Sequence, residues 1–148
     1  MTLVIGFGNP LRGDDAVGPS VARAAEIERS DVSVLTPHQL LPELAPDISA
    51  ADVVVFIDAA TDLPAGAVRC QMVAPSSSPR LDHMLSPAAL VGLGLAAFDR
   101  APQAWLVEIG AESFELGHAL TPRVASAVPR AAELVRTLIP QLSRPRPT

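Results

Sequence analysis

The sequence predicts a three-layer α/β sandwich, in which a mostly parallel, five-stranded sheet has helices on both faces. Short apolar segments alternate with amphipathic segments along the chain, the order typical of parallel strands joined by helices. The most apolar segment, residues 53–57, holds five consecutive hydrophobic residues and is typical of a central strand buried on both faces. The length of 148 residues suits a single domain over 1–148, with a frayed tail at about 144–148.

In the first half of the chain, two strands and two helices precede the central strand. Residues 2–5 are too short an apolar run for a complete helix and contain Val and Ile, which favour a strand. Residues 16–28 place apolar side chains at helical spacing, with Pro19 in the first turn, where proline is tolerated. Residues 31–36 alternate apolar and polar side chains like a half-buried strand, and residues 40–51 return to the helical period.

The second half is predicted to contain the central strand, two further strands and two helices. The expected ranges are 52–58, 68–73 and 103–109 for the strands, and 87–98 and about 122–142 for the helices. Ser86 and Thr121 stand where the N-caps of these two helices should be. Pro129 interrupts the last helical pattern and should bend that helix.

A glycine-rich loop with two adjacent acids follows the first strand. Residues 6–18 read Gly-Phe-Gly-Asn-Pro-Leu-Arg-Gly-Asp-Asp-Ala-Val-Gly. One carboxylate of the Asp14-Asp15 pair can cap the next helix, which leaves the second free for chemistry. A dinucleotide fingerprint needs a glycine where Leu11 stands, and a P-loop needs a lysine, which the chain lacks. The loop therefore favours a cation over a phosphate.

A third acid, Asp58, closes the central strand. In open α/β sheets, ligands bind beyond the carboxyl ends of the strands. The glycine-rich loop and Asp58 are therefore predicted to lie at the same edge of the sheet and to share a site. The alternative for Asp58 is that it is an ordinary turn-forming aspartate. The alternative for Asp14 is that it caps the helix or braces the loop.

Composition excludes several other classes of function. The net charge of −5 and the pI near 5.0 argue against nucleic acid or an anionic membrane as a partner. The single cysteine, Cys70, can form neither an intramolecular disulfide nor a thiolate metal cage, and it is expected to pack in or near the core. No apolar run is long enough to span a bilayer, and Met1 is not followed by a basic leader, so we expect a cytoplasmic protein.

The glycine-rich loop with its two acids and Gly18 resembles the opening motif of the hydrogenase maturation proteases. These endopeptidases trim the C-terminal extension from the large subunit of [NiFe] hydrogenases. The resemblance continues through most of the chain, at Asp58-Ala59, at His83 ahead of Leu85-Ser86-Pro87, and from Ile109 through Gly117 to Leu120-Thr121-Pro122.

The resemblance implies a set of site residues. Asp15, Asp58 and His83 would contact a metal and form the catalytic site, and Gly6, Gly8, Asn9 and Asp14 would form the substrate-binding loop. The metal would be nickel already carried by the precursor, with another divalent metal as the alternative. Two carboxylates and one imidazole suit such an ion and leave coordination positions open. His38 and His118 are expected to be ordinary loop residues.

The resemblance thus implies a metal-dependent or aspartyl-type endopeptidase that is monomeric when free. It would act on a [NiFe]-hydrogenase large-subunit precursor after nickel loading and use the metal as a recognition handle. The alternative is a non-catalytic module of the same fold, either a metal-sensing chaperone or a small-ligand binder. The two differ in outcome, because only the protease shortens the precursor.

Overall fold

Five strands form one sheet in the computed structural model, which describes residues 1–77 and 85–141. The strands are β1 (Thr2–Gly6), β2 (Val32–Leu35), β3 (Val53–Ala60), β4 (Val68–Val73) and β5 (Gln103–Gly110). Their order is β2-β1-β3-β5-β4. All neighbouring pairs are parallel except β4 with β5, so the predicted mostly parallel five-stranded sheet is confirmed.

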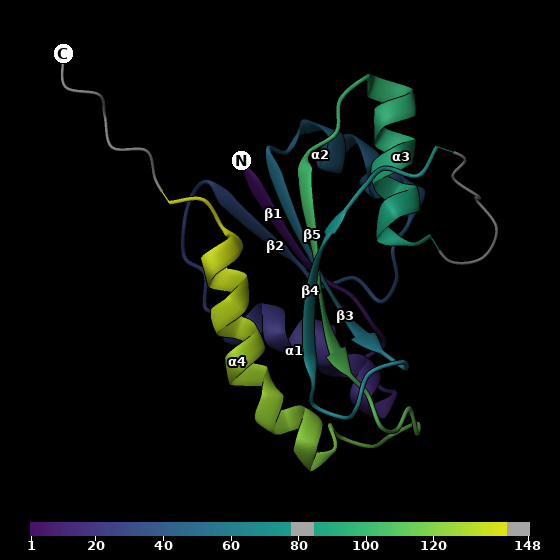
Figure 1. The fold of residues 1–148 in the computed structure, drawn as a ribbon, viewed down its shortest axis with the longest axis vertical. Coiled ribbons are helices and arrows are strands. Elements are labelled where there is room, and N and C mark those ends of the chain that lie inside the picture. Colours follow the sequence, from purple (N-terminus) through teal and green to yellow (C-terminus); the bar gives the residue numbers. More distant parts are fainter. Residues whose placement is uncertain (78–84, 142–148) are drawn as a thin grey trace.

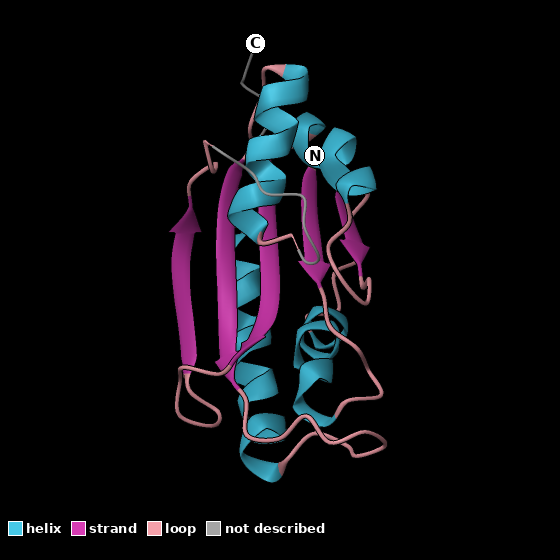
Figure 2. Ribbon diagram, turned by 90° about the vertical axis from the view of Figure 1, so that its right-hand side faces the viewer, coloured by secondary structure: helices cyan, strands magenta, loops and turns pink. Residues whose placement is uncertain are grey.

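Helices cover both faces of this sheet. The helices are α1 (Val17–Ala24), α2 (Ala45–Ala50), α3 (Pro87–Phe98) and α4 (Pro122–Leu138), with short 3-10 turns η1 (Gly13–Ala16) and η2 (Pro42–Leu44) before α1 and α2. The first and last helices pack together on one face, and α2 and α3 pack together on the other (Figures 1 and 2). The predicted three-layer α/β sandwich is therefore confirmed.

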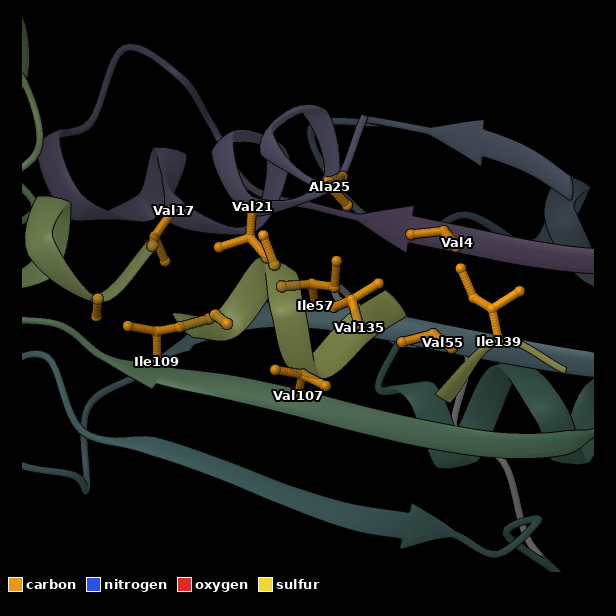
Figure 3. Packing of buried hydrophobic residues seen from close by; sticks show 14 of the residues in the cluster. Val4, Val17, Val21, Ala25, Val55, Ile57, Val107, Ile109, Val135 and Ile139 are labelled. Atoms are coloured by element: carbon orange, nitrogen blue, oxygen red, sulfur yellow. The ribbon is translucent and has the colours of Figure 1, made fainter. Parts of the chain in front are cut away.

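The central strand β3 supplies side chains to two separate hydrophobic cores. Val55 and Ile57 pack with α1 and α4 in the core drawn in Figure 3, whereas Val54 and Phe56 pack with α2 and α3. All four are completely buried. The run of five apolar residues is thus explained, because successive side chains of a strand point to opposite faces and both faces are covered.

Several predicted boundaries were wrong. The first helix ends at Ala24, and Glu26 has a positive φ of 46°. Only a 3-10 turn and a six-residue helix form within 40–51, each with a proline at its start. The last helix ends at Leu138 because Pro140 disfavours helical backbone at Ile139, whose ψ is 125°. Strand β3 continues two residues beyond Asp58, since its last residues still pair with β5.

Other local predictions had mixed outcomes. The Ser86 cap is confirmed, because its hydroxyl oxygen accepts from the backbone N–H of Ala89 at 3.1 Å. Thr121 holds the N-cap position of α4 but makes no side-chain cap bond. Cys70 is exposed rather than buried. The predicted tail at 144–148 and His83 lie outside the described residues. Within the described ranges, no helix has the length and hydropathy needed to cross a bilayer.

Candidate functional site

Two glycines allow α1 to start directly against the strands. A Cβ on Gly6 would lie 2.3 Å from the carbonyl oxygen of Gly18, and one on Gly18 would lie 2.6 Å from that of Ile57. Distances this short exclude any side chain at either position. The close approach brings the η1 turn, and Asp15 within it, to the carboxyl end of β3.

The loop before η1 is shaped by Asp15 and Asn9. The backbone N–H of Asn9 donates to Oδ2 of Asp15 at 2.7 Å, and the side-chain oxygen of Asn9 accepts from the N–H of Leu11 at 2.9 Å. Gly8 has φ +149°, and a Cβ there would lie 2.0 Å from the Asp15 carbonyl oxygen. In the predicted substrate-binding loop, Gly8 thus allows close packing and the Asn9 carboxamide oxygen folds the loop.

Asp14 is completely buried, and its carboxylate holds a distant segment of the chain. Its two oxygens accept from the backbone N–H groups of Glu112, Ser113 and Thr121 at 2.7–3.0 Å, and from the Thr121 hydroxyl. Burial raises the pKa of Asp14, but these hydrogen bonds outweigh it and hold the pKa below its ordinary value. Asp14 therefore braces the loop, and neither it nor Asp15 caps a helix.

Asp58 stands on the α2 and α3 face of the sheet, in line with the buried Val54 and Phe56. Its Oδ1 accepts from the N–H of Ala59 at 2.8 Å. Burial raises the pKa of Asp58 to about 7, against the opposing effect of the Ala59 hydrogen bond and with the help of negative charge on Asp15 and Glu108. A carboxyl in this position exchanges its proton near neutral pH.

Asp15 and Asp58 line one cleft of about 440 Å³ at the carboxyl edge of the sheet. The predicted sharing of an edge by these two residues is confirmed by this cleft. Its other walls are formed by Phe7, Gly8, His38, Gln39, Leu40, Ala59, Thr61, Leu85, Ser86, Pro87 and Phe114. The third predicted ligand, His83, lies outside the described residues. Among residues 1–77 and 85–141, no three His, Cys, Asp or Glu side chains are close enough to hold a metal ion.

Sequence reasoning missed several residues that line this cleft. His38, expected to be an ordinary loop residue, lines it together with Gln39, Thr61 and Phe114. A signal for His38 was present, because it follows β2, whose carboxyl end lies at the same edge as those of β1 and β3. His118 does not line the cleft and instead pairs with Glu115 at 3.0 Å.

A further acid stands beside Asp58 on the neighbouring strand. Glu108 of β5 is in register with Asp58, and its Oε1 accepts from Nε and Nη2 of Arg69 at 3.0 and 2.8 Å. Gln71 also donates to this oxygen at 3.2 Å. The pairing keeps Glu108 fixed on the sheet. Glu108 does not line the cleft, but its negative charge contributes to the raised pKa of Asp58.

The raised pKa of Asp58 predicts an unusual dependence of stability on pH. The folded protein binds the Asp58 proton more tightly than the unfolded chain, whose pKa is the ordinary 3.8. Stability from this group is therefore full below about pH 4 and is lost as the pH rises through about 7. We expect Asp58→Asn to remove this dependence. The unfolding free energy of the variant minus that of the wild type should then increase by up to roughly 3 kcal/mol as the pH rises from about 5 to about 8.

Urea unfolding of both proteins at the two pH values measures this difference. Parallel pH curves for wild type and Asp58→Asn would show that Asp58 titrates normally in the folded protein. An Asp47→Asn variant, with an exposed acid away from the cleft, serves as the control and should follow the wild-type curve.

Comparison with known proteins supports the family suggested by the sequence motif. No family model matches the chain, and no curated protein matches it. Among solved structures, the hydrogenase maturating endopeptidase HybD from E. coli is 28% identical, with a TM-score of 0.71 over 90% of this chain and 88% of that one. An endopeptidase from Escherichia coli is 27% identical, with a TM-score of 0.72 over 93% and 90% of the two chains.

A third structure extends the similarity to another organism. The [NiFe] hydrogenase maturation protease HycI from Thermococcus kodakarensis KOD1 is 23% identical, with a TM-score of 0.72 over 93% of this chain and 90% of that one. At this identity the match shows a shared fold. Together with the two more similar structures, it supports the predicted resemblance of this chain to the hydrogenase maturation proteases.

Proposed function

We propose that this protein is a processing endopeptidase that removes the C-terminal extension of a [NiFe]-hydrogenase large-subunit precursor after nickel loading. The observation that carries the proposal is the pair Asp15 and Asp58, which come from different elements and face one open cleft. The solved structures with the same fold include proteins described as hydrogenase maturation endopeptidases. A protease of this family needs such a cleft to receive a polypeptide.

The two carboxylates are suited to bind a cation that arrives with the substrate. Asp15 and Asp58 would supply oxygen ligands to precursor-bound nickel, and His83 is the proposed third ligand. The mutual repulsion of the acids raises the cost of leaving them all ionised, and a bound cation relieves it. Because the pKa of Asp58 is about 7, protons compete with the cation, and binding should weaken as the pH falls below that value.

The walls of the cleft are suited to hold the adjoining peptide. Phe7, Leu40, Leu85 and Phe114 provide apolar surface, and His38, Gln39 and Thr61 provide polar groups among them. A volume of about 440 Å³ accommodates a few residues of an extended chain. Recognition of the metal by Asp15 and Asp58 would place the neighbouring peptide bond in this space. A precursor that lacks the metal would lack this contact, and its peptide bond would not be positioned for cleavage.

The proposal is tested by incubating the purified protein with the precursor in nickel-loaded and nickel-free forms. Intact-mass spectrometry of the large subunit measures the result. We expect the loaded precursor to become shorter by its C-terminal extension and the nickel-free precursor to keep its full mass.

The other outcomes separate the parts of the proposal. Shortening of both forms would retain the endopeptidase and refute nickel as the recognition handle. Binding of the loaded precursor without shortening would favour the non-catalytic metal-sensing module of the same fold. Cleavage of neither form, with no binding, would refute a role in processing this class of substrate.

A further inference from the structure

His38 is the one basic side chain among the described residues that line the cleft. Its side chain is exposed, and among those same residues neither lysine nor arginine lines the cleft. The two carboxylates of Asp15 and Asp58 line the same space. The position of His38 relative to these two acids determines which part of a bound substrate it can contact.

The loop that carries His38 is held on both sides of this residue. The carbonyl oxygen of Pro37 accepts from the N–H of Gly8 at 3.2 Å, which ties this loop to the glycine-rich loop. Leu40 is only 3% exposed and packs in the core with α2 and α3. The backbone of His38 therefore has a fixed place at the cleft, while its exposed imidazole is available to a ligand.

The strand order determines where in the cleft His38 lies. Strands β2, β1 and β3 lie side by side in that order and point the same way (Figure 2). His38 follows β2, Asp15 follows β1, and Asp58 is near the end of β3. Neighbouring strands are about 4.8 Å apart, so the loop of His38 begins about 10 Å from the strand of Asp58. His38 is thus placed to contact a different part of the substrate from the part that Asp58 contacts.

A peptide that lies across the strand ends would reach both places. Each residue of an extended chain advances about 3.3 Å, so about three residues would separate a group bound at Asp58 from a group bound at His38. The negative charges of Asp15 and Asp58 would repel an acidic substrate side chain in this cleft, whereas a neutral backbone carbonyl is not repelled. An imidazole carries at least one N–H in either protonation state and can donate to that carbonyl oxygen.

We propose that His38 is a specificity-determining residue that donates a hydrogen bond to a backbone carbonyl of the substrate peptide, about three residues from the metal-bearing group. This inference rests on the proposed function and adds to it the direction of the peptide, which would run from Asp58 across the end of β1 toward β2. His38 would hold the peptide in the cleft. It would neither bind the metal nor take part in breaking the bond.

The first test compares His38→Ala with His38→Gln in cleavage of the nickel-loaded precursor. We expect KM to rise about fivefold in His38→Ala, with kcat changed by less than about twofold, because one hydrogen bond to the substrate is lost. The amide N–H of His38→Gln can still donate, so its KM should stay within about twofold of the wild-type value. The matched control is His118→Ala, which removes an exposed histidine that pairs with Glu115 and does not line the cleft.

A second test detects the contact without cleavage. The probe is a metal-free synthetic peptide that spans the processing site of the precursor. We expect this peptide to shift the imidazole nitrogen NMR resonances of His38, which are assigned from their loss in His38→Gln. The resonances of His118 should not shift. A purely structural role of His38 would predict no such difference between the two histidines.

The outcomes separate this inference from the proposed function. An unchanged KM in His38→Ala would overturn the inference and leave the protease intact. A fall in kcat at unchanged KM would also overturn it, because His38 would then act in the chemical step. Equal losses in His38→Ala and His38→Gln would refute a neutral carbonyl as the acceptor. If the wild-type protein does not cut the precursor, the proposed function fails, and the peptide-induced shift alone decides whether His38 contacts the peptide.

Discussion

Asp58→Asn is expected to abolish cleavage of a nickel-loaded precursor while the protein remains folded. The substitution keeps the size of the side chain and its ability to accept from the Ala59 N–H, but it removes the charge of the proposed ligand. Loss of one anionic ligand from a cation site costs several kcal/mol, so the cleavage rate should fall at least about a hundredfold. Because neutral asparagine relieves the cost of burying a charge, stability near pH 8 should not decrease.

Asp15→Asn should have a similar effect on cleavage, since Asp15 of the η1 turn lines the same cleft as Asp58 of β3. The matched control is Asp62→Asn, which removes the same charge shortly after β3 from a side chain that pairs with Arg69 and does not line the cleft. Intact-mass assays of all three variants, with circular dichroism to confirm folding, measure the result. Cleavage at wild-type rates by both Asp15→Asn and Asp58→Asn would refute the assigned site.

The second large effect is expected from Asp14→Ala and concerns stability. Removing this carboxylate leaves the N–H groups of Glu112, Ser113 and Thr121 without their acceptor. Each hydrogen bond to a charged group contributes about 1.5–3 kcal/mol, and water can replace part of this because the bonds are only partly buried, so the unfolding free energy should fall by about 4 kcal/mol in total. Residues 112–121 should become more mobile at the same time, because Asp14 ties this segment to η1.

Urea unfolding measures this loss, with Asp31→Ala as the control. Asp31 pairs with Arg29 at the surface, and its removal should destabilise the protein much less than removal of Asp14. The pKa of Asp14 lies below its ordinary value, so its contribution is present above that value and is lost as the pH falls through the folded pKa. Equal destabilisation by the two substitutions would show that the buried bonds add little.

The order and type of the elements could be predicted from the sequence, because they depend on local patterns. The apolar run at 53–57 indicated a strand covered on both faces, and the two cores confirm this. The Ser86 cap was equally local. The strand order and the antiparallel direction of β4 could not be predicted from local patterns, since they depend on pairings between distant segments.

The candidate site shows the same division. The sequence by itself determined that Asp15 and Asp58 would lie at one edge of a parallel sheet, because every strand of such a sheet ends on the same side. Only the tertiary structure decided that Asp14 is committed to a loop about 100 residues away and that Glu108 stands beside Asp58. Hydrogen bonds and burial at these positions come from partners remote in the chain, and no local pattern encodes them.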